Sequence, residues 1–344
     1  MPRVAIIGTG LIGASIGLGL QANGAPGLEI VGSDRFRDNA RGAEQVHAVD
    51  RVEADPRKAV QGAGLVIIAV PILAIHEVME EIAGSLEPGA VVTDTGSTKG
   101  DVLRWACELL PSNVAFVGGH PMAGKTETGP RAADAKLFEG ARWVIAAPRN
   151  VPGDAVEVVN GLAKGLGALP QFMDAMEHDA YVAAISHLPM AAATALFRLA
   201  RSSEAWPELS VLASTGFKDT TRLTATEPAM AHDILITNRE QIVGWLRRYR
   251  EELRKLEDEI ANVTDEAALF RSISETNLQY TGFREGVVGR QEIHDNMLDE
   301  IPEAGMMDLI LGGALAERAR ELQKRSEERL AESEREMRSG GRGA

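Results

Sequence analysis

The sequence VAIIGTGLIG at residues 4–13 joins four aliphatic residues to a glycine-rich turn and then to the start of an amphipathic segment. The aliphatic run predicts a β-strand over Val4–Gly8, and the pattern of Leu11–Ala22 predicts a helix that follows the turn. A strand, a short turn and a helix in this order are typical of the first unit of an α/β sheet. We therefore expect strands and helices to alternate beyond residue 22.

The turn itself carries the pattern G-x-G-x-x-G over residues 8–13. Gly8 permits the tight turn, Gly10 lets the backbone approach a pyrophosphate, and Gly13 lets the helix pack closely on the strand. Leu11 and Ile12 lie in the first helical turn, where unpaired N–H groups and the positive end of the helix dipole attract anions. The glycine pattern alone is a weak signal, but its place between a strand and a helix predicts a dinucleotide site.

The first half of the chain continues this alternation, as expected. Its short Val-, Ile- and Ala-rich runs indicate strands that are buried on both faces, as in a doubly wound parallel sheet covered by helices. The predicted strands after the first are Glu29–Ser33, Leu65–Pro71, Ala90–Thr95, Val114–Gly118, Trp143–Ala147 and Pro170–Met173, and the predicted helices between them include Ile72–Leu86 and Lys99–Leu110. These elements predict a Rossmann-type domain over residues 1–173.

The second half is predicted to be an all-α domain over residues 174–313, followed by a charged helical tail over 314–344 with a disordered end. Its predicted helices are Met176–Leu188, Pro189–Arg201, Glu208–Thr215, Ala229–Asn238 and Glu240–Asn262. In the last of them Ile242, Leu246, Tyr249, Leu253, Leu256 and Ile260 form one apolar stripe. Such a stripe packs on another helix, either in the same chain or in a second copy, and we favour a subunit interface.

Composition limits the kind of partner. The formal net charge is −14, from 50 acidic and 36 basic residues, which disfavours nucleic acid or an anionic membrane as the main partner. The single cysteine, Cys107, fits a reducing compartment and rules out an internal disulfide. The sequence contains no stretch of about 18 apolar residues, and a strand is predicted from residue 4. A cytoplasmic protein is therefore expected.

Further residues specify the cofactor. Asp34 ends the second predicted strand, 21 residues after Gly13, where a carboxylate accepts hydrogen bonds from a ribose 2′-hydroxyl and repels a 2′-phosphate. Val70 and Pro71, at the end of the strand that begins at Leu65, are expected at the same sheet edge. NAD is the predicted cofactor. Arg35 and Arg37 could accommodate a phosphate, and Asp34 could instead cap a turn.

Two side chains after predicted strands are suited to acid–base chemistry. His120 lies in GGHPMAG at residues 118–124, and a neutral imidazole there can accept the proton of a hydroxyl while hydride leaves the same carbon. Ser97 in DTGSTKG at residues 94–100 can hold the same hydroxyl by a hydrogen bond. The alternatives are a turn histidine without catalytic function, and a serine that caps the helix from Lys99.

Three residues of the helical half are candidates for substrate binding. Arg222 and Lys218 lie together in GFKDTTR at residues 216–222, where an acidic protein could gather positive charge for a carboxylate. A surface ion pair with Asp219 is the alternative. His187, in SHLP, lies where a helix break is predicted, and a structural role competes with a functional one. The seven histidines show no spacing typical of a metal site.

The chain resembles prephenate dehydrogenases and their arogenate-using relatives over about residues 3–262. The resemblance is carried, in the family's order, by GTGLIGASIGLGL, DTGSTKG, HPMAG followed by Gly129, LFEGARWVIAAP, HDAYVAAISHLP and GFKDTTRLTATEP. It implies NAD-dependent oxidative decarboxylation of prephenate to 4-hydroxyphenylpyruvate on the route to tyrosine, and a homodimer formed through the helical domain. Arogenate, which would give tyrosine directly, remains the alternative substrate.

The resemblance also implies residue roles. His120 is expected to accept the hydrogen bond of the substrate hydroxyl with help from Ser97, Arg222 to clamp a carboxylate, and His187 to place the substrate. Two positions depart from the family's pattern: many members have an acidic residue where this chain has Thr126, and a histidine often follows SHLP where this chain has Met190. Thr126 therefore puts an ion-pair gate in doubt, and the methionine can alter the pocket.

Two rival functions remain at this point. A β-hydroxyacid dehydrogenase has the same architecture, but such enzymes commonly use a lysine of the helical domain, whereas this chain offers His120. A non-catalytic NAD-sensing or scaffold protein could retain the fold, because a fold alone does not establish an activity. The joint presence of Ser97, His120 and Arg222 argues against the second rival. No regulatory domain is predicted over residues 263–344.

Overall fold

The computed structural model describes residues 3–23, 27–125, 127–263 and 266–286. The chain divides into two compact units, Met1–Tyr249 and Arg250–Ala344. The predicted tail over 314–344 lies outside the described residues, and the predicted domain boundary after residue 173 stays a prediction.

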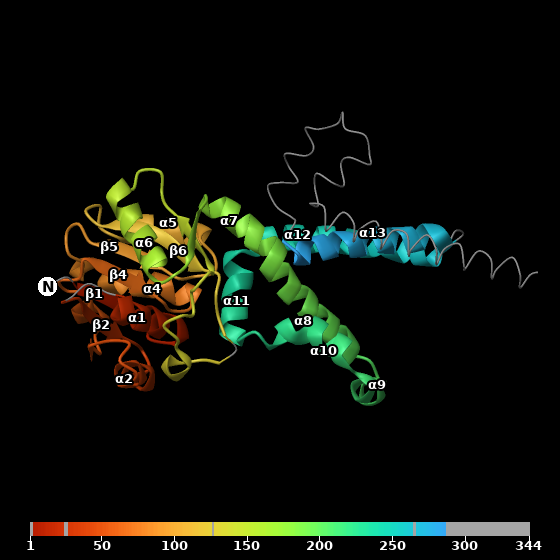
Figure 1. Ribbon diagram of the computed structural model, residues 1–344, viewed down its shortest axis with the longest axis horizontal. Coiled ribbons are helices and arrows are strands. Elements are labelled where there is room, and N and C mark those ends of the chain that lie inside the picture. The colour runs from red at the N-terminus through yellow and green to blue at the C-terminus, as the bar shows by residue number, and fades with distance from the viewer. Residues whose placement is uncertain (1–2, 24–26, 126, 264–265, 287–344) are drawn as a thin grey trace, which may run out of the picture. The chain divides into compact units, whose positions relative to one another are not determined.

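The first unit is built on a mixed sheet in the order β3-β2-β1-β4-β5-β6-β7-β8 (Figure 1). Every pair from β3 to β6 is parallel, so the prediction of a doubly wound α/β sheet is confirmed. The strands are β1 (Arg3–Ile7), β2 (Glu29–Ser33), β3 (Arg51–Val52), β4 (Leu65–Ile68), β5 (Val91–Asp94), β6 (Ala115–Pro121), β7 (Arg142–Ala146) and β8 (Leu169–Phe172).

The sheet is not parallel throughout, and in this respect the prediction was wrong. Strand β7 runs antiparallel to β6, with His120 opposite Val144, and β8 is again parallel to β7. A parallel neighbour needs a crossover, usually a helix, and the described residues between β6 and β7 contain only the short 3₁₀ turn η2 (Pro130–Ala132). Strand β6 also extends three residues beyond the predicted end at Gly118, so His120 lies on the strand itself.

Helices cover both faces of the sheet. The helices of this half are α1 (Leu11–Asn23), α2 (Arg37–Gln45), α3 (Pro56–Ala59), α4 (Ile72–Ile82), α5 (Gly100–Leu109) and α6 (Gly153–Gly165), with the 3₁₀ turn η1 (Ala83–Ser85) after α4. Alternate residues of β1, β2, β4, β5 and β6 enter two separate cores, because successive side chains of a strand point to opposite faces.

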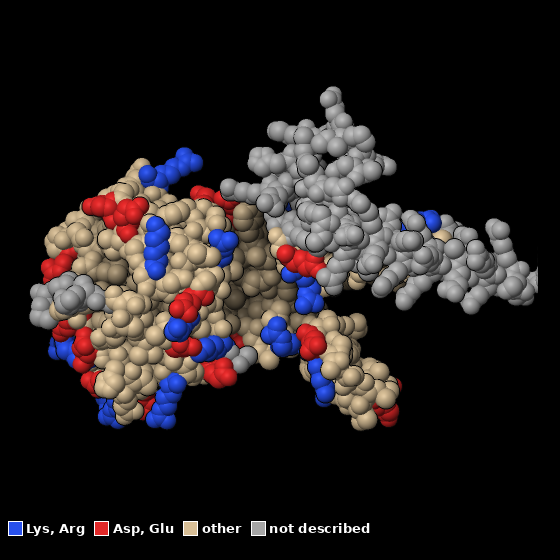
Figure 2. All heavy atoms as spheres, viewed as in Figure 1, with Lys and Arg blue, Asp and Glu red and all other residues tan. Residues whose placement is uncertain are grey.

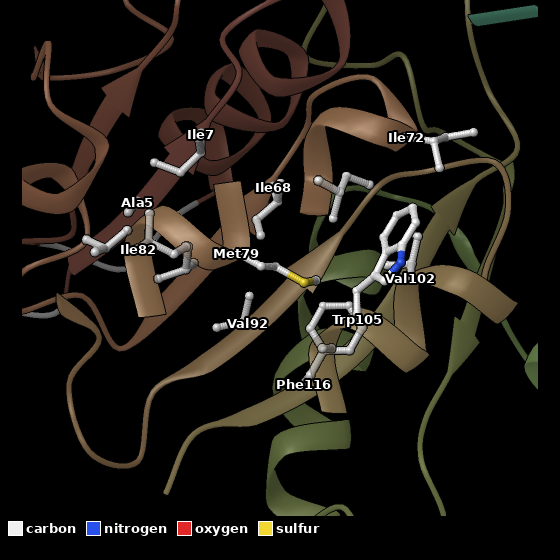
Figure 3. Packing of buried hydrophobic residues seen from close by; sticks show 14 of the residues in the cluster. Ala5, Ile7, Ile68, Ile72, Met79, Ile82, Val92, Val102, Trp105 and Phe116 are labelled. Carbon is white, nitrogen blue, oxygen red and sulfur yellow. The ribbon is translucent and has the colours of Figure 1, made fainter. Parts of the chain in front are cut away.

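One core lies under α3, α4 and α5 and continues into the helical half through Ala183, Met190, Ile234 and Ile242. Figure 3 shows its centre, where Met79 lies among side chains from β4, β5 and α5. The other core packs α1, α2 and α6 on the opposite face. The first core therefore ties the helices that follow residue 174 to the sheet.

The helical half begins with one long helix in three parts. Helix α7 (Ala175–Val182) passes into a π-helical segment, η3 (Ala183–His187), and then into α8 (Leu188–Arg201). The predicted break near His187 is therefore wrong, since the chain widens into a π turn and stays helical. Pro189 explains the widening: it has no N–H to donate to the preceding turn, and its ring crowds the carbonyl four residues earlier.

The remaining elements are α9 (Trp206–Leu212), α10 (Thr215–Thr221), the 3₁₀ turn η4 (Arg222–Ala225), α11 (Pro228–Thr237), α12 (Arg239–Ala261) and α13 (Glu266–Arg284). The sequence pattern had not indicated α13. On α12, Ile242 is buried and Leu246 packs on the first core. The later members of the predicted stripe, from Tyr249 to Ile260, have exposed side chains in the single chain.

The helix over Ala175–Arg201 is long enough and apolar enough to cross a membrane. Core helices of soluble proteins share both properties, so this is weak evidence for a membrane span. His178, Asp179 and His187 of this helix are buried and hydrogen-bonded to other parts of the first unit. Acidic and basic side chains are scattered among each other over the visible face of the described residues (Figure 2).

Candidate active site

The glycine turn has the geometry that its sequence predicts. Gly8 has a φ of +94°, and a Cβ there would lie 2.3 Å from the carbonyl oxygen of Ala69. A Cβ on Gly13 would lie 1.9 Å from the carbonyl oxygen of Gly8, so α1 can approach the turn only without a side chain at this position. Gly10 faces open space, with no atom within 4 Å of a Cβ. The turn is thus tight where it meets the protein and open where a phosphate would bind.

The turn lies at the point where the strand order reverses, because β1 pairs with β2 on one side and with β4 on the other. Ligands of open α/β sheets bind in the crevice at this switch point. Val70 and Pro71 follow β4 here, and a Cβ on Gly8 would lie 2.7 Å from Cγ1 of Val70. Leu11 and Ile12 open α1 and are partly exposed. Gly8 and Val70 therefore lie side by side at the switch point.

Asp34 follows β2 and faces the same turn. Its Oδ2 accepts a hydrogen bond of 2.8 Å from the backbone N–H of Thr9, and its Oδ1 accepts one of 2.8 Å from Phe36 N–H. The carboxylate does cap a turn, as the alternative interpretation held, but it also lies beside the glycine turn. A free helix start, an open Gly10 and this carboxylate fit the pyrophosphate and adenosine ribose of a dinucleotide.

The loop after β5 is organised by a buried ion pair that sequence reasoning missed. Asp94 and Lys99 are both fully buried, and Lys99 Nζ donates to Asp94 Oδ2. Asp94 also accepts hydrogen bonds from Gly96 N–H at 2.8 Å and from Gly119 N–H at 3.1 Å, which ties this loop to β6. Burial lowers the pKa of Lys99, and the Asp94 carboxylate opposes that shift. The pair holds the loop that carries Ser97 beside the strand that carries His120.

Ser97 does not cap α5, which was its alternative role. The first N–H groups of α5 are held by Asp179 of α7, whose Oδ1 accepts from Lys99 N–H and whose Oδ2 accepts from Gly100 N–H, both at 2.8 Å. Ser97 is partly exposed and, within the described part of the chain, its hydroxyl has no hydrogen-bond partner. That hydroxyl is therefore available to a substrate.

His120 lies near the end of β6 and faces a second histidine. Its Nδ1 is 2.9 Å from Nε2 of His178, and the two rings are nearly perpendicular, at 83°. The pKa of His120 lies well below its ordinary value, chiefly because burial disfavours the charged ring, and also because His178, Lys99 and His187 repel a positive charge. The imidazole is therefore neutral at pH 7 and can accept a proton.

His187 is fully buried in the π segment and bonded to Asn238 at the end of α11. Asn238 Nδ2 lies 2.7 Å from the backbone carbonyl oxygen of Asp179, and this contact identifies the atom as the amide nitrogen. The same nitrogen is 3.1 Å from His187 Nδ1, so that ring nitrogen accepts and Nε2 carries the hydrogen. Burial lowers the pKa of His187 to about 4.

Among the described residues, no hydrogen bond or ion pair joins the predicted cations to this cluster. Arg222 begins η4 and Lys218 lies on α10; both are exposed, and neither forms an ion pair with Asp219 among the residues that the structure describes. No contact joins them to His120 in that part of the chain. Thr126 lies outside the described residues. Within the described ranges, no cluster of His, Cys, Asp and Glu could hold a metal ion.

Comparison with known proteins agrees with this arrangement. Residues 16–170 match the model of the prephenate dehydrogenase nucleotide-binding domain, and residues 174–275 match the model of the prephenate dehydrogenase dimerization domain. The chain belongs to the prephenate dehydrogenase family. It is 34% identical to the prephenate dehydrogenase of Bacillus subtilis over 92% of this chain and 85% of that protein.

Two solved structures of the prephenate dehydrogenase family and its arogenate-using relatives are also similar. A prephenate dehydrogenase from Aquifex aeolicus, in complex with hydroxyphenyl propionate and NAD+, has a TM-score of 0.76 at 26% identity, covering 82% of this chain and 98% of that chain. The arogenate dehydrogenase of Synechocystis has a TM-score of 0.70 at 28% identity, covering 83% of this chain and all of that one. The Rossmann-type fold with a helical domain is thereby confirmed.

No role was predicted from the sequence for His178 or Asp179, although the segment that begins HDAY carries part of the resemblance to the prephenate dehydrogenase family. Both are buried and join His120 to the start of α5. The available signal was an adjacent histidine and aspartate at the start of a helix that is otherwise largely apolar. Buried polar side chains must find partners, so this pair could have been expected to bond to other elements of the site.

Proposed function

We propose that the protein catalyses the NAD-dependent oxidative decarboxylation of prephenate to 4-hydroxyphenylpyruvate. The observation that carries this proposal is the state of His120, an imidazole kept neutral by burial and bonded through Nδ1 to His178. A neutral ring whose Nδ1 carries the hydrogen and donates it to a neighbour offers Nε2 as an acceptor for the proton of a hydroxyl. The family match and the dinucleotide-type turn supply the context for that chemistry.

In this proposal His120 accepts the proton of the ring hydroxyl at Nε2 as the carbon–hydrogen bond of the same carbon breaks. The ring carboxylate then leaves as carbon dioxide, its bonding electrons complete the aromatic ring, and the ring oxygen takes the proton back from His120 to give the phenol hydroxyl. Ser97 donates or accepts a hydrogen bond at the same hydroxyl and fixes its direction. The protein therefore needs to move one proton and to hold the substrate in line.

NAD, when bound, accepts the hydride that leaves the substrate. The backbone of Gly8–Gly13 and the first turn of α1 would hold its pyrophosphate, and Asp34 would hold the adenosine ribose. Val70 and Pro71, beside Gly8 at the switch point, would border the cofactor. The NAD+ bound in the similar A. aeolicus structure supports this choice of cofactor.

The substrate carboxylates require cations that the acidic chain must gather locally. We assign this role to Arg222, with Lys218 nearby, because both cations are exposed and free of Asp219. His187, with a hydrogen on Nε2, would donate to a substrate oxygen. Thr126 is kept as a substrate-binding candidate on the strength of its position after HPMAG.

Arogenate is the second candidate substrate, and one observation favours keeping it. Met190, directly after SHLP, is buried in the core and takes the place where a histidine often stands in the family. The two substrates differ only in an amino against a keto group on the side chain, so such a change can alter preference. The similar Synechocystis structure is an arogenate dehydrogenase. A β-hydroxyacid dehydrogenase is disfavoured, because the described helices after residue 174 carry only exposed lysines, Lys218 and Lys255.

We further propose that the protein acts in the cytoplasm as a homodimer. Residues 174–275 match a dimerization domain, and the second half of α12 carries an exposed apolar stripe. The cytoplasmic assignment rests on the single cysteine and on the relatives, which are prephenate dehydrogenases.

The test is a substrate comparison combined with one variant. Reduction of NAD+ is expected with prephenate or arogenate and not with simple hydroxyacids. Comparing prephenate with arogenate at the same NAD+ concentration gives the substrate preference. His120→Asn is expected to lower kcat by about 10²–10⁴-fold while NAD+ binds with unchanged Kd, because only the proton acceptor is lost.

The matched control is His232→Asn, which makes the same replacement at a histidine whose side chain is 64% exposed. It should keep wild-type kcat. Turnover of simple hydroxyacids alone, or an active His120→Asn enzyme, would overturn the proposed function.

A further inference from the structure

The strongest feature without an assigned role is a line of three side chains that ends at His120. His178 Nε2 is 2.9 Å from His120 Nδ1, and His178 Nδ1 is 2.8 Å from Asp179 Oδ1. His178 and Asp179 are 1% and 3% exposed, so water does not compete for these bonds. The line therefore has a fixed order: carboxylate, imidazole, imidazole.

The carboxylate at one end is itself held in place. Asp179 accepts hydrogen bonds from Lys99 N–H and Gly100 N–H at the start of α5, one on each oxygen. A carboxylate held by two backbone donors offers only acceptors to its third neighbour. His178 Nδ1 must therefore carry the hydrogen of that bond.

The position of this hydrogen decides the rest of the line. A neutral imidazole has one N–H, so His178 Nε2 is left as an acceptor. His120 Nδ1, opposite that acceptor, must then donate, and His120 Nε2 is left with a lone pair. Within the described residues, that second nitrogen has no other hydrogen-bond partner.

We propose that His178 and Asp179 are positioning residues that keep the hydrogen of His120 on Nδ1 and so leave Nε2 as the proton acceptor of the active site. The proposal rests on the proposed function for its catalytic meaning. Once Nε2 has taken the substrate proton, the charged ring keeps donating through Nδ1 to His178, with the Asp179 carboxylate behind it. The line thus sets the tautomer before the reaction and stabilises the charge that forms during it.

A purely structural role is the alternative, because Asp179 also caps α5 and a cap alone stabilises a helix by about 1 kcal/mol. Asp179 variants would mix the two roles. His178 is the better probe, since its ring bonds, among the described residues, to His120 and Asp179 alone. His178→Phe keeps a ring of similar size but has no acceptor. His178→Gln is the matched variant, because its amide oxygen can reach the place of Nε2.

The expected result is a split between these two variants. His178→Phe should lower kcat by about 10²–10³-fold with the Kd of NAD+ unchanged, since the His120 hydrogen is no longer fixed on Nδ1. His178→Gln should recover kcat to within about tenfold of wild type, because an acceptor is restored. Wild-type turnover in the phenylalanine variant, or equal losses in both variants, would overturn the proposal.

A second measurement needs no variant of this pair. In wild-type protein labelled with ¹⁵N-histidine, NMR at pH 7.5 distinguishes hydrogen on Nδ1 from hydrogen on Nε2, and the His120 signals are assigned by their loss in His120→Asn. Hydrogen on Nδ1 is expected, and hydrogen on Nε2 overturns the proposal. The NMR measurement does not depend on turnover. A protein that is inactive on prephenate and arogenate would refute the proposed function, but the NMR spectrum would still show which nitrogen of His120 carries the hydrogen.

Discussion

His187 shows how a single buried residue links the site to the stability of the protein. Its ring is 1% exposed, and its pKa is lowered to about 4 from the ordinary 6.5, mainly by burial. In the unfolded chain the same ring takes up a proton near pH 6.5. Because the folded state resists that proton, folding is favoured most above pH 6.5 and loses stability as the pH falls towards 4.

The expected loss from His187 is about 3 kcal/mol in the free energy of unfolding between pH 6.5 and 4, from the shift in its pKa at 1.36 kcal/mol per unit. Urea unfolding at several pH values, for wild type and His187→Gln, measures it. The glutamine variant does not titrate, so its stability should fall less steeply with acid. Parallel curves for the two proteins would show that His187 does not contribute.

For single residues, the sequence predicted the roles that depend on positions close by in the chain. It missed the roles that depend on positions far away in the chain. Gly8 and Gly13 could be assigned because their constraints lie in one turn. Asp179 could not, because the N–H groups that it holds belong to residues about 80 positions earlier. The packing of the helices on the sheet decides which buried acidic residue caps which helix. This packing cannot be derived from a single sequence.

Among the elements, the π segment between α7 and α8 places two histidines on one side of the helix. His178 and His187 are nine residues apart. In a regular α-helix they would be turned by roughly 180° from each other, at about 100° per residue. A π turn accommodates about one extra residue and reduces this angle to roughly 80°. Both rings can therefore face the same site, His178 towards His120 and His187 towards Asn238.

Replacing Pro189 with alanine should let the π segment return to a regular α-helix, because alanine supplies the missing N–H and removes the ring. His187 would then lie roughly 180° from His178 and turn away from Asn238, so we expect kcat/KM to fall by at least about 100-fold with the Kd of NAD+ unchanged. Deleting Ala184 in the same variant is the control: eight residues at about 100° each return the angle to roughly 80°, and kcat/KM should recover. Equal kcat/KM for Pro189→Ala with and without the deletion would mean that the π turn has no functional importance.

For the whole molecule, the sequence predicted the class of the fold and missed one strand direction. The aliphatic runs indicated the strands β1, β2 and β4–β8, because buried strands need such residues. The direction of β7 is decided by its connection from β6, and composition does not encode direction. Strand β3, with two residues, is too short to give a pattern, and helix α13 has no clear apolar stripe along its sequence.

The stripe on α12 makes a prediction about assembly. Leu253, Leu256 and Ile260 are 48%, 45% and 60% exposed in the single chain, although such residues favour burial by about 1.5–3 kcal/mol each. If a second copy covers this stripe, light scattering should give twice the monomer mass of 36.8 kDa. The double variant Leu253→Glu with Leu256→Glu should be monomeric, because two carboxylates would have to lose water at the interface. Lys255→Glu introduces the same side chain roughly 200° around the helix from Leu253 and should remain dimeric. A monomeric wild type, or a dimeric double variant, would show that the stripe does not join two copies.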